Sequence, residues 1–289
     1  MSLRISHTKR EVFMDRVLSD ESILQLLHDD APWGDLTTSL LIPATASARV
    51  EFRARFPMTL CATEESARMF ELKGASLDFL QPSGSQLAPG DPILSASGSA
   101  QTLLTVWKSA QVIVEWASGI ASAARAMVDG AQGIPVACTR KQVPGTKALS
   151  IKAVHAGGAV MHRLGVSESI LVFAEHRQFF HTCSGKTLFQ LKQRAPEHRA
   201  IVEVHDIEDA IHWAQSGAEI LQLDKFSPTD IRLCKTHIEK AGLATRLGIA
   251  GGVNPGNIHE FVAAGADFIV TSWPYYASPK DVQVNFIAQ

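Results

Sequence analysis

Apolar segments of strand length alternate with amphipathic segments of helical length through the second half of the chain. The apolar segments are IPVAC (134–138), SILVF (169–173), AIVEV (200–204), EILQL (219–223), RLGIA (246–250) and FIVTS (268–272). Such alternation is typical of a parallel sheet built from βαβ crossovers. It predicts either a β/α barrel or an open doubly wound sheet, and the pattern alone leaves both open.

Two stretches of this half can be laid over each other. HDIEDAIHWAQSGAEILQLD and NPGNIHEFVAAGADFIVTSW each contain an amphipathic helix, a Gly-Ala turn, an acidic residue and an apolar strand. Their turns, at Gly217 and Gly265, are 48 residues apart. That offset is about two β/α units of barrel length, so the repetition supports a β/α architecture.

The first part of the chain has a different pattern. ARVEFRARF (48–56) alternates with period two, and QPSGSQLAPGDPILSASGSAQ (81–101) is rich in turn residues, as in antiparallel strands joined by tight turns. We predict a small α/β sandwich at residues 1–110, which regains the tail at about 274–289, and a barrel domain at 111–289. Residues 101–131 predict a long helix that is interrupted at Gly119.

Composition and charge exclude several classes of protein. Lys and Arg number 27 against 29 Asp and Glu, a net charge of -2, so no broad basic field for nucleic acid or anionic membrane is expected. Four widely separated cysteines show no zinc-binding spacing. The sequence has no signal-peptide core and no apolar run of about 18 residues. We therefore expect a cytoplasmic protein with reduced thiols that neither inserts into a membrane nor binds nucleic acid.

Polar residues with chemical potential follow the predicted strands. In parallel β/α folds, the groups at the carboxyl ends of strands gather at one rim. The candidates there are Thr139, Arg140, Lys141, Glu203, Asp224, Gly251, Gly252 and Ser272. His162 and Arg163 follow the Gly157-Gly158 pair, in a segment that predicts a helix or the end of one.

Each candidate also has a purely structural interpretation. Arg140 and Lys141 could lie in a solvated loop, and Glu203 and Asp224 could be ordinary polar residues of a barrel end. The glycines of AGGVNPGN could serve a tight turn as well as a phosphate site at a helix N-terminus, and His162 could be a satisfied core residue. As a set, however, they suit a substrate with two or more phosphates, bound Mg²⁺ and an anionic second substrate. Phosphoribosyl pyrophosphate with a carboxylated acceptor has those properties.

The run TRKQVPGTKALSIKAVHAGGAVMHRLGVSESILVF resembles the quinolinate phosphoribosyltransferase family, also called nicotinate-nucleotide pyrophosphorylases. WGDLTT, APGDPIL and SGIASA upstream match that family in order, as do VEV, LQLDKFSP and AGGVNPGNI downstream. The resemblance covers nearly the whole chain. Within the family it is strongest to the ModD group, which is associated with molybdenum transport.

This resemblance implies a type II phosphoribosyltransferase fold, with an N-terminal α/β sandwich and an open seven-stranded α/β barrel. It implies a pentosyltransferase that takes phosphoribosyl pyrophosphate, Mg²⁺ and an anionic nitrogen heterocycle. It also implies a homodimer, or a higher oligomer of such dimers, in which each active site takes a basic residue from the partner chain. Carried over by position, the catalytic residues would be Glu203, Asp224 and Lys141, with the two carboxylates near the Mg²⁺. The substrate-binding residues would be Lys108, Thr139, Arg140, His162, Arg163, Gly251, Gly252 and Ser272.

Several positions depart from the family pattern. Lys108 stands where the family has an arginine and Phe173 where it has an active-site lysine, while Ala250 and Ile249 stand where it usually has serine and glutamate. These departures predict an acceptor other than quinolinate. They also leave open a second function, a binding or regulatory protein of molybdate metabolism that kept the fold without turnover. A third alternative, an unrelated phosphate-binding barrel enzyme, does not explain the ordered motifs.

Overall fold

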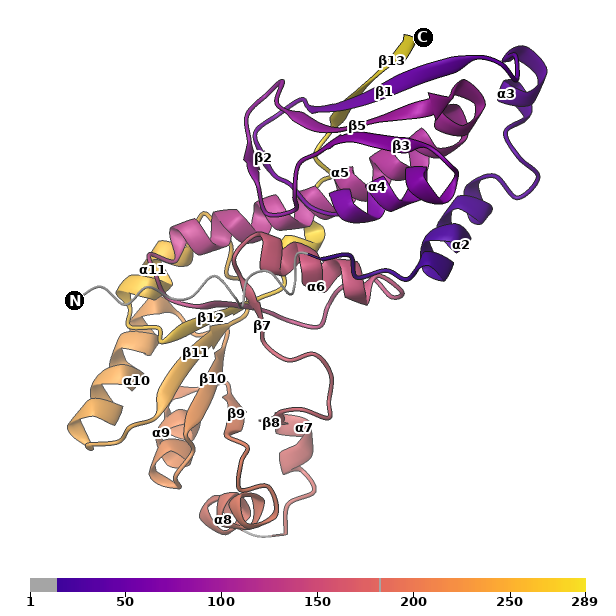
Figure 1. Ribbon diagram of the computed structural model, residues 1–289. Coiled ribbons are helices and arrows are strands. Elements are labelled where there is room, and N and C mark those ends of the chain that lie inside the picture. The colour runs from indigo at the N-terminus through magenta and orange to yellow at the C-terminus, as the bar shows by residue number, and fades with distance from the viewer. Residues whose placement is uncertain (1–14, 182) are drawn as a thin grey trace, which may run out of the picture. The chain divides into compact units, whose positions relative to one another are not determined.

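The computed structural model describes residues 15–181 and 183–289 (Figure 1). The chain divides into two compact units. Unit 1 comprises Met1–Arg125, Gln142–Gly158 and Pro274–Gln289, and unit 2 comprises Ala126–Lys141 and Ala159–Trp273. No helix of the described residues is both long enough and apolar enough to cross a membrane.

Unit 1 is built on an antiparallel sheet with the strand order β13-β1-β5-β3. Its strands are β1 (Ser47–Ala54), β3 (Ser76–Leu80), β5 (Pro92–Ser99) and β13 (Val282–Ala288), and a separate two-stranded sheet pairs β2 (Met58–Thr59) with β4 (Gln86–Leu87). The period-two pattern of β1 places Val50, Phe52 and Ala54 in the core. Pairing of β13 with β1 brings the end of the chain into this sheet.

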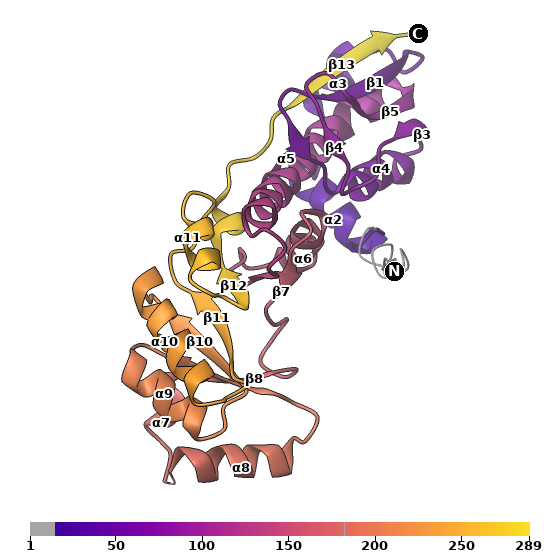
Figure 2. The same cartoon turned by 90° about the vertical axis from the view of Figure 1, so that its left-hand side faces the viewer.

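Helices cover one face of that sheet (Figures 1 and 2). They are α4 (Thr63–Leu72) and part of α5 (Ala100–Gly130), while α2 (Asp20–Asp30) packs on α4, and α3 (Leu36–Leu41) and α6 (Lys147–Ala156) complete the helices of the unit. Ser19 and Asp35 cap α2 and α3, since each side-chain oxygen accepts a backbone N–H of the first turn. Phe70 of α4 packs edge-on against Phe52 of β1, with ring centroids 6.0 Å apart, so the amphipathic face of α4 closes the core.

The long helix is continuous, and the predicted interruption at Gly119 is wrong. Residue 119 lies inside α5, where a Cβ atom would be 2.5 Å from the carbonyl oxygen of Ser278. The presence of glycine at position 119 is therefore explained by the segment before β13, whose backbone lies too close to α5 for any side chain. The pattern identified the glycine correctly but gave it the wrong role.

Unit 2 contains a parallel sheet of seven strands in the order β7-β6-β12-β11-β10-β9-β8. The strands are β6 (Val136–Cys138), β7 (Val160–Met161), β8 (Ile170–Val172), β9 (Ala200–Val204), β10 (Ile220–Asp224), β11 (Arg246–Ala250) and β12 (Phe268–Thr271). Every pairing is parallel, and β7 and β8 form the two edges without pairing to each other among the described residues. The sheet is therefore an open half-barrel.

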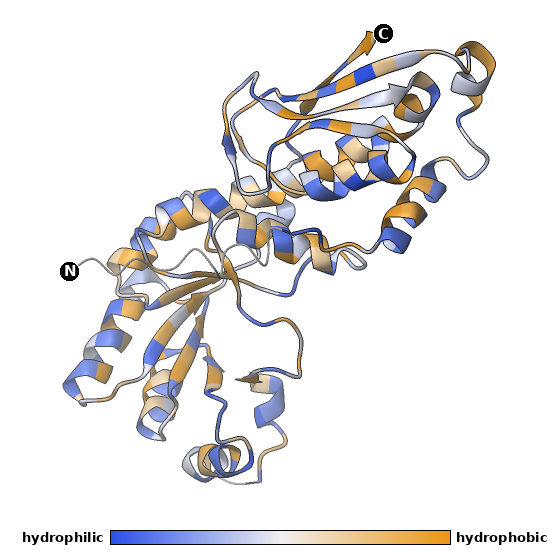
Figure 3. Cartoon of the chain, viewed as in Figure 1, coloured by the Kyte–Doolittle hydropathy of each residue, from blue (hydrophilic) through white to orange (hydrophobic). Residues whose placement is uncertain are grey.

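The helices of unit 2 are α7 (Ala174–Arg177), α8 (Ser184–Arg194), α9 (Ile207–Gln215), α10 (Pro228–Lys240) and α11 (Ile258–Ala263). The short 3₁₀ helix η1 (Trp273–Tyr276) begins at the last residue of unit 2 and continues into unit 1. α9, α10 and α11 lie along the outer side of strands β9 to β12 (Figures 1 and 2). In Figure 3 these strands are mostly hydrophobic, whereas the helices carry hydrophobic and hydrophilic residues together. This is the expected pattern when strands are covered on both faces and helices on one.

Candidate active site

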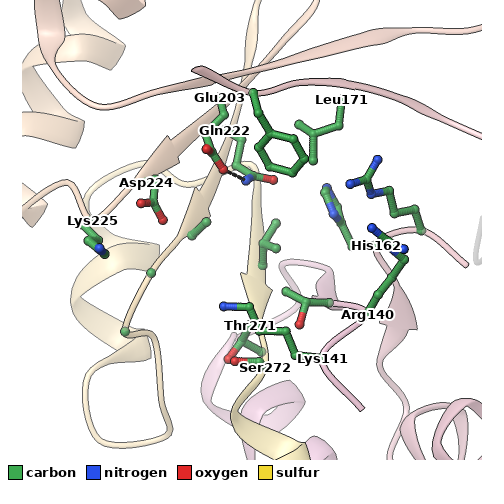
Figure 4. Close-up of a pocket in the computed structure, with 17 residues that line it drawn as sticks. Arg140, Lys141, His162, Leu171, Glu203, Gln222, Asp224, Lys225, Thr271 and Ser272 are labelled. Atoms are coloured by element: carbon green, nitrogen blue, oxygen red, sulfur yellow. Dashed lines mark hydrogen bonds between the residues drawn. The ribbon is translucent and has the colours of Figure 1, made fainter. Parts of the chain in front are cut away.

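The carboxyl ends of the seven parallel strands surround a cavity of about 590 Å³ in unit 2 (Figure 4). Ten of the residues selected from the sequence line it, namely Thr139, Arg140, Lys141, His162, Arg163, Glu203, Asp224, Gly251, Gly252 and Ser272. Each strand except β8 contributes at least one of them. The parallel arrangement thus gathers residues that are up to 133 positions apart in the sequence.

Backbone hydrogen bonds extend beyond the strands and hold this rim in place. The N–H of Thr139 donates to Thr271 O (2.9 Å), and that of His162 donates to Cys138 O (2.8 Å). The N–H of Lys225 donates to Ala250 O (2.8 Å). The candidate side chains therefore extend from backbone that is hydrogen-bonded to the neighbouring strands.

His162 and Arg163 do not lie in a helix. Helix α6 ends at Ala156, and Gly158 has φ 87°, the left-handed conformation that glycine adopts readily at helix ends. The chain then forms the two-residue strand β7, and His162 and Arg163 follow it at the rim. The interpretation in which the glycines end a helix and present these residues is therefore correct, and Gly157 is also closely packed, since a Cβ there would be 2.5 Å from the carbonyl oxygen of Ala121.

The Gly251-Gly252 turn has a local reason for both glycines. Their φ angles are 88° and 75°, and a Cβ at residue 251 would be 2.7 Å from Cγ of Lys225. The turn does not open a helix directly, because α11 begins only at Ile258 and has six residues. The expected helix does follow this turn, through Asn254-Pro255-Gly256, and the turn itself faces the cavity.

Four cations line the cavity without an ion-pair partner among the described residues: Arg140, Lys141, Arg163 and Lys225. Burial, and then the charge of nearby Arg140, lower the pKa of Arg163. Two guanidinium groups that disfavour each other are stabilised when an anion binds between them. The cavity is therefore prepared for an anionic ligand.

Two carboxylates, Glu203 and Asp224, lie on the side of the cavity that also carries Lys225, away from Arg140. Burial, and then neighbouring Asp224, raise the pKa of Glu203. His205 lies between them, with Nε2 3.8 Å from Glu203 and Nδ1 3.7 Å from Asp224. The Nε2 group of Gln222 donates to Glu203 Oε2 at 2.7 Å, and this hydrogen bond fixes the carboxylate (Figure 4).

His162 is neutral in this setting. Burial, and then the charge of Arg163, lower its pKa to about 4, and its ring stacks on Phe268 with centroids 6.5 Å apart. Its Nε2 atom is buried and has no hydrogen-bond partner among the described residues. A buried polar atom that lacks a partner inside a cavity marks a place for a ligand.

Some cavity residues were not selected from the sequence. Leu171, Gln222, Lys225, Val270 and Thr271 line the cavity, as does Phe173, which entered only as a departure from a family pattern. The polar Gln222 within the apolar strand EILQL was the one usable signal. The others are hydrophobic, charged or hydroxyl-bearing residues of ordinary appearance, and only the fold places them here.

Lys108, the remaining selected residue, does not line this cavity. It lies in α5, donates to Oε1 of Gln111 at 3.0 Å and lies 4.6 Å from the centre of the Trp107 ring. It borders another cavity in unit 1, of about 470 Å³, together with Val112 and Trp116. Its place in an active site shared between two chains stays a prediction.

Comparison with known proteins assigns most of the chain to one family. Residues 35–118 match the model of the quinolinate phosphoribosyl transferase N-terminal domain, and residues 120–285 match that of the C-terminal domain. The ModD protein of Rhodobacter capsulatus, a proposed pyrophosphorylase, is 43% identical over 220 residues, which are 74% of this chain and 85% of that protein. The nicotinate-nucleotide pyrophosphorylase (carboxylating) of Mycobacterium leprae is 27% identical over 256 residues, or 86% of this chain and 90% of that protein.

A solved structure shows the same fold. The crystal structure of NadC from Streptococcus pyogenes superimposes with a TM-score of 0.84 at 26% identity, covering 93% of this chain and 96% of that one. The predicted fold class is thereby confirmed, in its open half-barrel form. From these matches and from the residues at the rim, the chain belongs to the quinolinate phosphoribosyltransferase family.

Proposed function

We propose that this chain transfers the phosphoribosyl group of phosphoribosyl pyrophosphate to a nitrogen-ring carboxylic acid and releases pyrophosphate. The observation that carries the proposal is the set of unpaired cations in one cavity, in which Arg140 and Lys141 lie away from the two carboxylates and Lys225 lies beside Asp224. The donor carries phosphate groups that require the cations and a ribose whose hydroxyls require hydrogen-bond acceptors. Family membership supports the same donor.

The residues divide naturally between the parts of the donor. We assign the 5′-phosphate to the Gly251-Gly252 turn and Ser272, where backbone N–H groups can approach it closely. Lys141 and Arg140 face the cavity from the loop after β6 and would neutralise the pyrophosphate, and Arg140, which is near Arg163, would also contact the carboxylate of the acceptor. Glu203 and Asp224 would accept from the ribose hydroxyls.

A divalent cation fits the two carboxylates. Mg²⁺ usually takes one or two carboxylates together with substrate phosphates and water. Glu203 and Asp224 meet that requirement, whereas no group of three or more metal-binding side chains exists within residues 15–181 and 183–289. Mg²⁺ bound with the donor would stabilise negative charge on the pyrophosphate.

The transfer needs no nucleophile from the protein. The lone pair of the acceptor ring nitrogen forms the new bond to C1 of the ribose, and the C1–O bond breaks with its electron pair leaving on pyrophosphate. Positive charge that develops on the sugar lies near Glu203 and Asp224, and negative charge on the leaving group lies near the cations. Charges fixed in advance in this way lower the barrier without reorganisation.

A homodimer in the cytoplasm is part of this proposal. Unit 1 exposes Trp33 (96%), Leu36 (72%), Leu40 (73%) and Leu41 (72%), an apolar group around α3 that contact with a second copy would cover. Lys108 would then reach the partner's active site as the basic residue that the family resemblance implies.

A binding or regulatory role without turnover is the second candidate. Phe173 favours a role without turnover. Its uncharged aromatic ring lies beside Arg163, at a position where a cationic side chain would help to bind an anionic acceptor. Release of pyrophosphate with any nitrogen-ring carboxylic acid would exclude this candidate.

Binding of the donor tests the proposal. We expect calorimetric titration with phosphoribosyl pyrophosphate and Mg²⁺ to give one site per chain. Arg140→Ala should weaken binding roughly tenfold or more, because a hydrogen-bonded charge pair is lost. Lys186→Ala, which removes an exposed cation from α8, is the matched control and should bind as the wild type does. No binding by the wild type, or equal loss in both variants, would contradict the proposal.

A further inference from the structure

One side of the cavity is formed by side chains that carry no charge themselves, although the guanidinium of Arg163 lies over the Phe173 ring at its border. Leu171 and Phe173 come from the end of β8, and Gln222 lies on β10 two strands away. Figure 4 shows Leu171 and His162 on the opposite side of the cavity from Asp224 and Lys225. We call this side, formed by Leu171, Phe173, His162 and Gln222, the uncharged wall.

The carbonyl oxygen of Gln222 is an unused acceptor in this wall. The residue is 6% exposed, and its Oε1 is buried with no hydrogen-bond partner among the described residues. Its orientation is fixed, because a carboxylate only accepts and the Nε2 group must therefore face Glu203. Oε1 consequently points away from Glu203, toward the side of Leu171 and His162 (Figure 4). A ligand group that satisfies it must be a donor.

Phe173 is held in place by the turn that follows β8. Its N–H donates to Nδ1 of His176 at 2.9 Å, and the two rings stack with centroids 5.7 Å apart and planes at 18°. The guanidinium carbon of Arg163 lies 5.3 Å from the centre of the same ring. The aromatic group is thus fixed, and it orients Arg163 by a cation–π contact.

These contacts leave one place for a carboxylate and none for a second. The Arg140 and Arg163 pair can receive one carboxylate. A second, placed against the uncharged wall, would meet an aromatic ring, a neutral histidine and a carbonyl oxygen. A buried carboxylate without a partner is strongly disfavoured, and a carbonyl oxygen nearby repels it.

We propose that the acceptor is an aromatic nitrogen heterocycle with a single carboxylate, and that it presents an N–H donor to Oε1 of Gln222 beside Phe173. This inference rests on the proposed function, since it concerns the second substrate of that reaction. The carboxylate binds Arg140 and Arg163, and the ring lies along the uncharged wall. Phe173 and Gln222 determine specificity against a dicarboxylic acid.

Two pyridines of nearly the same shape test the proposal. In pyridine-2,3-dicarboxylate both substituents are anionic, and in 2-carbamoylpyridine-3-carboxylate an amide replaces one of them. With the donor and Mg²⁺ present, we expect the amide to bind at least roughly tenfold more tightly than the diacid, by calorimetry, because it supplies the N–H and avoids the buried charge. Tighter binding of the diacid would overturn the proposal.

Substitutions of Phe173 and Gln222 test whether these two residues cause the preference for the amide over the diacid. Phe173→Lys should shift the ratio toward the diacid by roughly tenfold or more, since it adds a cation to the wall. Gln222→Leu should weaken the amide more than pyridine-3-carboxylate, which has no N–H to donate to Oε1, because the loss of the hydrogen bond to Glu203 affects both ligands alike. Phe189→Lys, at an exposed position of α8, is the matched control and should change neither ratio. Unchanged ratios in both cavity variants would also overturn the proposal.

Measuring the binding of phosphoribosyl pyrophosphate distinguishes failure of the proposed function from failure of the inference about the acceptor. If phosphoribosyl pyrophosphate does not bind the wild type, the proposed function itself fails. If the donor binds and the diacid is preferred, only the inference about the acceptor fails. Circular dichroism and unimpaired donor binding by the variants would show that an altered ratio reflects the wall and not loss of folding.

Discussion

The least expected residue of unit 1 is Lys152, a fully buried lysine in α6. Its ammonium lies 2.8 Å from Glu64 and 2.6 Å from Glu65 of α4. Burial alone would lower the pKa of Lys152, but the two carboxylates outweigh it and the pKa is raised. Likewise, burial would raise the pKa of Glu64 and Lys152 lowers it, so the group stays charged. Nothing in the pattern SIKAV indicated this, because the partners are 88 and 87 positions away.

Removing this cation should be costly. Lys152→Met leaves two carboxylates without their counter-charge, and we expect the free energy of unfolding to fall by about 3 to 5 kcal/mol in urea titrations at neutral pH. Lys192→Met is the control, since its partner Glu219 is 41% exposed and such a surface pair contributes about 0 to 1 kcal/mol. Equal effects of the two substitutions would refute this account of the buried group.

At the scale of elements, two features explain where the hydrophobic pattern gave the wrong helix or strand: a close backbone contact at Gly119 and the shortness of strand β7. In α5, Gly119 admits the backbone of Ser278, and in unit 2 the strand β7 has only two residues. A period cannot be recognised in two residues, so the sequence indicated six strands where the sheet has seven. Because β7 was not recognised as a strand, the sequence also did not show that His162 and Arg163 follow a strand end at the rim.

Gly119→Ala tests the close approach. Alanine gains about 1 kcal/mol of helix propensity, but its Cβ would be 2.5 Å from a backbone oxygen, and overpacking of this kind costs about 1 to 3 kcal/mol. We expect a net decrease in the thermal unfolding temperature. Gly185→Ala in α8 has its nearest atom 3.9 Å away and should leave that temperature unchanged or raise it. A more stable Gly119→Ala protein would contradict the proposed packing.

At the scale of the whole molecule, the predicted sharing of active sites has a direct test. Lys108→Ala and Arg140→Ala should each abolish most turnover, one through the partner's site and the other through its own. When the two variants are mixed and allowed to exchange subunits, half of the dimers carry one intact site, so about one quarter of the wild-type activity should return. Sedimentation would establish the dimer independently. Activity that stays at the level of the single variants, in dimers shown to exchange, would exclude a shared site.

The sequence by itself determined the parallel β/α character of unit 2, the strand β1 and ten of the residues around the cavity. Those features depend on local periodicity and on the rule that strand ends gather at one rim, and both can be recognised along a chain. It left barrel and doubly wound sheet open, because both satisfy the same alternation. The tertiary structure selected the open half-barrel and placed Lys152 in the core between two carboxylates. It also assembled the uncharged wall from Leu171, Phe173, His162 and Gln222. Such features depend on contacts between distant segments, and no local pattern encodes which segments will meet.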